Sequence, residues 1–299
     1  MVAAATLMAA TTLIAKALGT DALGAPLPAF EVTFGRFLFA AMAIGAVAAW
    51  RRPVILWHRW PVHGLRIAFG WSGVTLMFAA AAAIPLAEAT AISFLNPILA
   101  MLLAIPVLGE RPGRWRFGAA AVALAGAAVL LRPGAGAVQP GALLALGAAG
   151  LLACEITVIK RLTRIDGPLA ILCWSNGMGV IVAALAVIPV WQAPGLSQWA
   201  AMALLGVTMA CAQGCFVQAM RRADSSFVTP FSYLALVFAG VYDAAVFGVL
   251  PDGWGFLGAG LILAGAAILA WREARTARPA LPVTTSAGIP SGTSTRPAR

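Results

Sequence analysis

The strongest constraint on this chain is a series of long apolar segments separated by short breaks rich in proline, glycine and arginine. A membrane-spanning helix needs about 17–25 predominantly apolar residues. Ten segments meet that requirement, at residues 1–19, 32–50, 66–84, 87–109, 115–131, 141–160, 168–190, 199–220, 227–250 and 255–271. The sequence therefore predicts an all-α, polytopic membrane protein with ten transmembrane helices, since helices satisfy their own backbone groups in lipid.

The composition agrees with a membrane location. The chain is 62% hydrophobic and 10% charged, whereas soluble domains carry about a quarter of charged residues. The net charge of +10 would suggest a nucleic-acid partner in a soluble protein. Because lipid is the expected solvent here, we predict a membrane protein that binds no nucleic acid.

The positions of the basic residues predict the orientation of the chain. Most of them lie in alternate loops or after the last span, and Arg132 is an exception. The residues that follow this pattern are Arg51, Arg52, Arg59, Arg66, Arg111, Arg114, Arg116, Lys160, Arg161, Arg164, Arg221, Arg222, Arg272, Arg275, Arg278, Arg296 and Arg299. Basic loops stay in the cytoplasm, so both termini are predicted to be cytoplasmic. Residues 273–299 are polar and rich in proline, serine and threonine, and we expect a disordered tail there.

One stretch of sequence occurs nearly twice. Residues 107–130 read "VLGERPGRWRFGAAAVALAGAAVL", and residues 246–269 read "VFGVLPDGWGFLGAGLILAGAAIL". Alanine- and glycine-rich helices resemble one another by composition alone, but here glycine, proline, tryptophan and phenylalanine also share one register. We therefore predict two repeats, residues 1–133 and 140–272. Each has five helices, an odd number, so the second repeat enters the membrane inverted, a construction typical of secondary transporters.

The segment "FLNPILAMLLAIPVLGERPGRWRFGAAAVALAGAAVLL" resembles the drug/metabolite transporter superfamily, EamA type, in its proline within the fourth helix, its terminal Gly-Glu and its glycine-rich fifth helix. The stretches "FEVTFGRFLFA" and "DSSFVTPFSYLALVFAG" further resemble the bacterial S-adenosylmethionine uptake branch. The resemblance implies a transporter of the bacterial inner membrane whose substrate lies between the first four helices of each half. The second half departs from the motif, with Val249 in place of Glu110 and Leu236 in place of Pro97.

Ionisable residues inside spans cost about 2.5–3.5 kcal/mol each at the helix centre, so each is a functional candidate. Arg36 suits a substrate carboxylate, or pairs with Glu31. Asp243 has no basic neighbour on its own helix. It is expected either to carry a proton or bind an ammonium group, or to pair with Arg36 or another donor.

Three further ionisable residues are candidates for gating or coupling. Lys16 and Glu155 occupy equivalent positions of the two repeats, 139 residues apart. Lys16 takes part in transport or extends its ammonium group to the outer interface. Glu155 is expected to belong to a cytoplasmic gate. The simplest such gate is an ion pair of Glu155 with Lys160 or Arg161. Glu110, at the end of the fourth span, resembles a gate element of the family.

Neutral side chains complete the expected substrate cavity. The proline after Asn96 removes a backbone hydrogen bond and interrupts the fourth span. Trp71 and Trp174 are candidates for stacking on a ring of the substrate, although packing is the commoner role of such tryptophans. The neutral candidates are Ser93, Asn96, Trp71, Trp174, Asn176, Gln213 and Tyr233.

These features predict a secondary transporter, monomeric or homodimeric, for a small amino-acid-derived or zwitterionic metabolite. Export is favoured, and S-adenosylmethionine uptake or exchange is the alternative. A membrane enzyme or a channel fits less well, because the two histidines, His58 and His63, share one loop and no ring of charges is evident. No P-loop is present, so we expect a gradient or exchange to drive transport.

Cys211 and Cys215 have no histidine or carboxylate nearby in sequence, and we expect no metal or cofactor.

Overall fold

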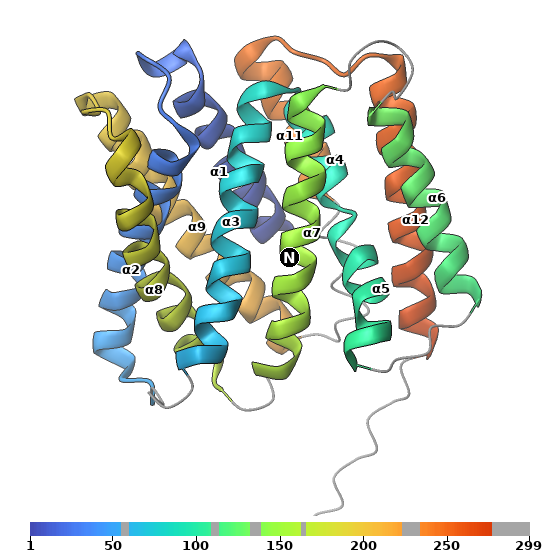
Figure 1. The fold of residues 1–299 in the computed structure, drawn as a ribbon, viewed down its shortest axis with the longest axis horizontal. Helices are drawn as coiled ribbons and strands as arrows, with labels where there is room; N and C mark the ends of the chain where they lie inside the picture. The colour runs from blue at the N-terminus through green and yellow to red at the C-terminus, as the bar shows by residue number, and fades with distance from the viewer. Residues whose placement is uncertain (55–59, 109–113, 132–138, 163–165, 223–233, 277–299) are drawn as a thin grey trace, which may run out of the picture.

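The computed structural model describes residues 1–54, 60–108, 114–131, 139–162, 166–222 and 234–276. These residues form a bundle of helices that stand side by side, with no strand among them (Figure 1). In chain order the elements are α1 (Val2–Gly19), the 3-10 turn η1 (Asp21–Leu23), α2 (Ala29–Arg51), α3 (Trp60–Ala83), α4 (Leu86–Ser93), α5 (Asn96–Leu108), α6 (Arg114–Leu131), α7 (Pro140–Leu162), α8 (Pro168–Val187), the 3-10 turn η3 (Ile188–Val190), α9 (Leu196–Arg222), α11 (Leu234–Phe247) and α12 (Gly253–Thr276).

Proline and glycine mark several helix ends. Helix α7 begins at Pro140 and α8 at Pro168. The first N–H groups of a helix have no acceptor within it, so the N–H that proline lacks is not needed there. Helix α11 ends at Phe247 and is followed by Gly248, whose φ of 66° is accessible to glycine at little cost. The Gly248 N–H donates to the carbonyl of Ala244 at 3.1 Å and closes the last turn.

Six of the described helices are long and apolar enough to cross a membrane: α1, α2, α3, α7, α8 with η3, and α9. Four shorter apolar stretches, at residues 86–100, 117–129, 234–247 and 253–268, account for the other predicted spans. The all-helical class is thus confirmed for the described residues, and six of their helices have the length and composition of membrane spans. The number of ten crossings stays a prediction.

The start predicted for the third span is wrong by six residues, because α3 begins at Trp60 and not at residue 66. Pro61 is acceptable in the first turn of a helix. His63 and Arg66 carry polar side chains and therefore resemble loop residues in sequence. In the structure both are buried and find partners inside the bundle.

The fourth span is interrupted. Helix α4 ends at Ser93 and α5 begins at Asn96, with Phe94 and Leu95 in a tight turn between them. The Leu95 N–H donates to the carbonyl of Ile92 at 3.0 Å, a contact typical of a 3-10 turn. Pro97 has no N–H to offer the carbonyl of Ser93, and the regular helix stops one turn before it.

The two halves of the sequence are interleaved. Helices of residues 1–133 make their main contacts with helices of residues 140–272: α3 with α7, α6 with α12, α1 with α9 and α11, and α2 with α8 and α9. The pairs α3·α7 and α9·α1 are related by the 139-residue offset. Helices α6 and α12, side by side at one edge of the bundle, run in opposite directions (Figure 1). This is the arrangement expected of inverted repeats.

Small residues allow α6 and α12 to approach closely, as is common for helices in membranes. A Cβ added at Gly126 would lie 2.7 Å from the carbonyl oxygen of Gly258, and one at Gly265 would lie 2.6 Å from that of Ala119. A Cβ at Gly118, near the start of α6, would meet nothing within 4 Å, so this glycine does not take part in the close approach.

Replacing Gly265 by valine should lower the stability of the protein, because the added side chain meets backbone atoms that cannot rotate away. Overpacking of this kind costs about 1–3 kcal/mol. Thermal unfolding in detergent measures the loss. Gly260→Val on the same helix is the matched control, since a Cβ at Gly260 meets nothing within 4 Å. Equal melting temperatures for the two variants would contradict the close packing of α6 on α12.

Candidate transport site

A cavity of about 230 Å³ lies among α2, α3, α7, α8 and α9. Two of these helices come from residues 1–133 and three from residues 140–272. The cavity is lined by Arg36, Phe37, Arg66, Ile67, Gly70, Trp71, Val74, Leu152, Glu155, Ser175, Met209 and Gln213. It is the place in the described bundle where charged, amide, hydroxyl and indole groups meet within apolar helices.

An ion pair between α3 and α7 forms one wall of the cavity. Arg66 Nη2 lies 3.1 Å from Glu155 Oε1, and Arg66 Nη1 donates to the carbonyl of Ile171 on α8 at 3.4 Å. Gly70 leaves the room that the carboxyl group needs, since a Cβ there would lie 2.7 Å from Glu155 Cδ. Arg66 therefore connects α3 to both α7 and α8.

Arg36 reaches the same cavity from α2. Its side chain is 5% exposed, and its guanidinium carbon lies 4.3 Å from the centre of the Phe37 ring. Both Arg36 and Arg66 interact electrostatically with Glu155. The expected pairing of Arg36 with Glu31 is not made, because Glu31 Oε2 accepts the backbone N–H of Gln192 at 3.2 Å.

Several buried donors at the cavity have no hydrogen-bond partner among the described residues: Arg36 Nη1, Arg66 Nε and Trp71 Nε1. A buried polar group left unpaired costs about 1–3 kcal/mol, and more if it is charged. Unpaired donors at the wall of a cavity are therefore suited to bind the acceptor atoms of a ligand.

The cavity brings together predicted residues from separate parts of the sequence. Arg36, Trp71, Glu155 and Gln213 all line it. Asn176 lies next to it, with Nδ2 donating to Leu172 O at 2.9 Å and to Gln213 Oε1 at 3.5 Å. The predicted residues thus include most of the polar groups of the cavity.

Other predicted residues do not line this cavity. Ser93 lies at the end of α4, where its hydroxyl donates to the carbonyl of Thr90 at 2.7 Å, and Asn96 begins α5. Lys16 and Asp243 lie elsewhere in the bundle. Tyr233 and Glu110 lie outside the described residues.

Sequence reasoning missed Arg66 as a cavity residue. It was assigned to a cytoplasmic loop because the apolar segment was taken to start there. A signal for it is Gly70, four residues later on the same helix face, a small residue that leaves room for a partner of the charged side chain. Glu155 pairs with this arginine, and the side chains of Lys160 and Arg161 lie outside the described residues.

The prediction that His63 lies in a loop is wrong. His63 is fully buried in α3, its Nε2 lies 3.2 Å from Asp166 Oδ2, and its ring stacks on Trp174 at 5.2 Å between centres. Trp174 therefore stacks on a protein side chain. The contact connects the beginning of α3 to the segment before α8, at the end of the bundle where α2 ends.

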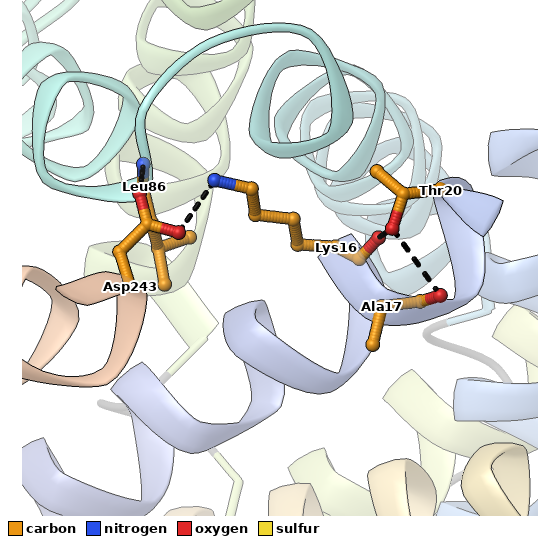
Figure 2. Close-up of polar contacts among 5 residues, drawn as sticks. All are labelled: Lys16, Ala17, Thr20, Leu86 and Asp243. Atoms are coloured by element: carbon orange, nitrogen blue, oxygen red, sulfur yellow. Dashed lines mark hydrogen bonds and ion pairs between the residues drawn. The ribbon is translucent and has the colours of Figure 1, made fainter. Parts of the chain in front are cut away.

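A second buried ion pair lies at the opposite end of the bundle. Lys16 Nζ on α1 and Asp243 Oδ1 on α11 are 2.5 Å apart, and Asp243 Oδ2 accepts the N–H of Leu86 at 2.7 Å (Figure 2). Asp243 is 1% exposed and Lys16 6%. One carboxyl group thus connects α11 to α1 and to the first residue of α4. The partner of Asp243 is Lys16 and not Arg36, and Lys16 does not extend to the surface.

Comparison with known proteins identifies the type of molecule. The profile of the EamA-like transporter family matches the chain twice, over residues 1–132 and 139–271. A solved crystal structure superposes with a TM-score of 0.58 at 27% identity, covering 90% of this chain and 98% of that one.

Named relatives differ in substrate and direction. A riboflavin transporter of Rhizobium johnstonii is 31% identical over 223 residues, 72% of each chain. An S-adenosylmethionine uptake transporter of Rickettsia prowazekii is 26% identical over 259 residues, 85% of this chain and 87% of the relative. The aromatic amino acid exporter YddG of Ancylobacter novellus is 29% identical over 271 residues, 84% and 91% of the two chains. These matches confirm the predicted resemblance and indicate a transporter, not an enzyme: the chain belongs to the EamA-like transporter family.

Proposed function

We propose that this protein is a secondary transporter of the bacterial inner membrane that moves a small organic metabolite through the cavity among α2, α3, α7, α8 and α9. The observation that carries the proposal is the set of buried charges at the cavity wall, contributed by helices of both halves. Buried charges inside a bilayer are costly and mark substrate pathways. A site between two halves is the location that alternating access requires.

The proposed topology has ten membrane crossings in two inverted repeats, with both termini in the cytoplasm. It is supported by the antiparallel pair α6 and α12 and by the positions of the basic residues. Arg51, Arg114 and Arg222 all lie at ends of helices, and the ends of α2, α6 and α9 that carry them share one face of the bundle (Figure 1). This face is the proposed cytoplasmic side.

Two polar clusters form the proposed gates. On the outer side, Lys16, Asp243 and the Leu86 N–H connect α1, α11 and α4. On the cytoplasmic side, the ion pair of Arg66 with Glu155 connects α3 to α7, and His63 with Asp166 connects α3 to the segment before α8. Alternating access requires that the contacts of the outer cluster and those of the cytoplasmic cluster separate in turn.

The proposed substrate is an amino-acid-derived compound. Arg36 presents an unpaired guanidinium nitrogen, and a planar guanidinium fits a carboxylate with two parallel hydrogen bonds. The cavity volume of about 230 Å³ lies below the roughly 300–1,000 Å³ of pockets for drug-sized ligands. This favours a molecule of amino-acid size. Transport of riboflavin or S-adenosylmethionine would require a wider cavity in another conformation.

Replacing Arg36 by glutamine should reduce transport about 10- to 100-fold, because a hydrogen bond to a charged group contributes about 1.5–3 kcal/mol. Uptake of labelled aromatic amino acids, riboflavin and S-adenosylmethionine into right-side-out and inverted vesicles measures both the substrate and the direction. Arg51→Gln, at the exposed end of the same helix, is the control and should keep the wild-type rate. If the Arg36 variant transports as fast as the control, the cavity is not the substrate site.

Removing either charge of the outer pair should open the outer side more often. A single cysteine placed at Val74, in a background without the native cysteines, reports access to the cavity. Lys16→Met and Asp243→Asn should each raise the rate of labelling by a membrane-impermeant maleimide from outside, whereas Lys16→Arg keeps the charge and should label as slowly as the parent. Unchanged labelling in both charge-removing variants that still elute as folded protein would exclude the outer gate.

The topology is tested by fusions. Green fluorescent protein attached to either end should fluoresce, and alkaline phosphatase at the same positions should be inactive, because both termini are proposed to be cytoplasmic. An active phosphatase fusion at one terminus would mean an odd number of crossings and would contradict the inverted repeats.

A further inference from the structure

The charges at the cavity wall are not balanced. Of the lining residues, Arg36 and Arg66 carry positive charge and Glu155 carries negative charge, and the others are neutral. The three come from α2, α3 and α7, so the imbalance is built by three separate helices. All three are coupled electrostatically. The wall therefore has one positive charge more than it has negative charges.

The hydrogen-bonding groups show the same imbalance. Glu155 shares one oxygen with Arg66, while Arg36 Nη1, Arg66 Nε and Trp71 Nε1 have no acceptor among the described residues. Arg36 and Arg66 are 5% and 6% exposed, so bulk water is not available to replace a missing acceptor. A ligand that completes this wall has to bring acceptor atoms and negative charge.

We propose that the cavity selects small carboxylates of net charge −1, with the carboxylate bound between Arg36 and Arg66 and the ligand body against Trp71, Val74 and Leu152. This proposal rests on the proposed function and names the substrate class of its site. When a monoanion is bound, the charges of the cavity wall and of the ligand add up to zero. Glu155 remains paired with Arg66 and holds that guanidinium in place.

Other charge states fit the wall less well. With a zwitterion bound, the total charge of wall and ligand stays at +1, and the ammonium group of the ligand lies near two guanidinium groups. S-adenosylmethionine carries a sulfonium and an ammonium group but one carboxylate, so its binding would raise this total charge to +2. In a medium of low dielectric constant these differences are much larger than in water. A phosphate monoester, with a charge of about −1.5 to −2, exceeds the charge of the wall.

The experiment uses three probes of one size that differ in charge: 3-phenylpropionate, phenylalanine and phenylalanine amide. Their dissociation constants for the full-length protein in nanodiscs are measured at pH 7 by calorimetry. For the wild type we expect the anion to bind at least tenfold more tightly than the zwitterion and the zwitterion more tightly than the cation. Equal or reversed affinities in the wild type would overturn the proposal.

Two variants change the charge of the wall in opposite directions. Glu155→Gln, which keeps the shape of the side chain, should raise the preference for the anion over the zwitterion by at least another tenfold. Arg66→Gln should reduce that preference to near unity, and Arg51→Gln should leave it at the wild-type value. Because each preference is a ratio within one variant, partial loss of folded protein cancels. Ratios that do not move in opposite directions would overturn the assignment.

Failure of this inference and failure of the proposed function give different results. If the probes bind in the expected order but no probe or metabolite crosses the vesicle membrane, the charge selectivity stands and the transport proposal fails. If transport depends on Arg36 but phenylalanine is carried as well as 3-phenylpropionate, the protein is a transporter and the monoanion selectivity is wrong.

Discussion

The structure depends on one constraint, which is that a charge inside a lipid-embedded bundle has to find its partner within the protein. Lys16 and Asp243 meet this constraint with each other, and Arg66 meets it with Glu155. The charge of Arg36 is compensated only in part, by the face of the Phe37 ring and by the electrostatic attraction of Glu155. Arg36 lines the cavity together with the Arg66–Glu155 pair, so the positive charge that is not fully compensated lies where a ligand can reach it.

The two ion pairs occupy related positions and have unrelated chemistry. Lys16 and Glu155 are equivalent under the 139-residue offset, yet one is a cation that pairs with α11 and the other an anion that pairs with α3. If the halves are inverted repeats, as proposed, the same repeat position carries charges of opposite sign in the two halves. The two ends of the bundle then differ in their polar contacts although their helices correspond.

Much of the architecture could be predicted from the sequence because it depends on local patterns. Apolar length identified the helices, proline and glycine identified their ends, and Asn96-Pro97 identified the break in the fourth span. Pairing across the bundle could not be predicted, since Lys16 and Asp243 are 227 residues apart and no local pattern connects them. Arg66 and His63 were misplaced for the same reason. A polar residue near the end of an apolar segment resembles a loop residue until its tertiary partner is known.

The interleaving of the halves has a consequence for how the protein is made. Helix α1 is synthesised well before α9 and α11, against which it packs. At about 5–20 residues per second, the 227 residues between Lys16 and Asp243 take roughly 10–50 s to translate. During that interval Lys16 has no Asp243 to pair with, and a lysine side chain is long enough to extend from a helix end to the lipid headgroups. Only after α11 has been made can the ammonium group be held inside the bundle by its carboxylate partner.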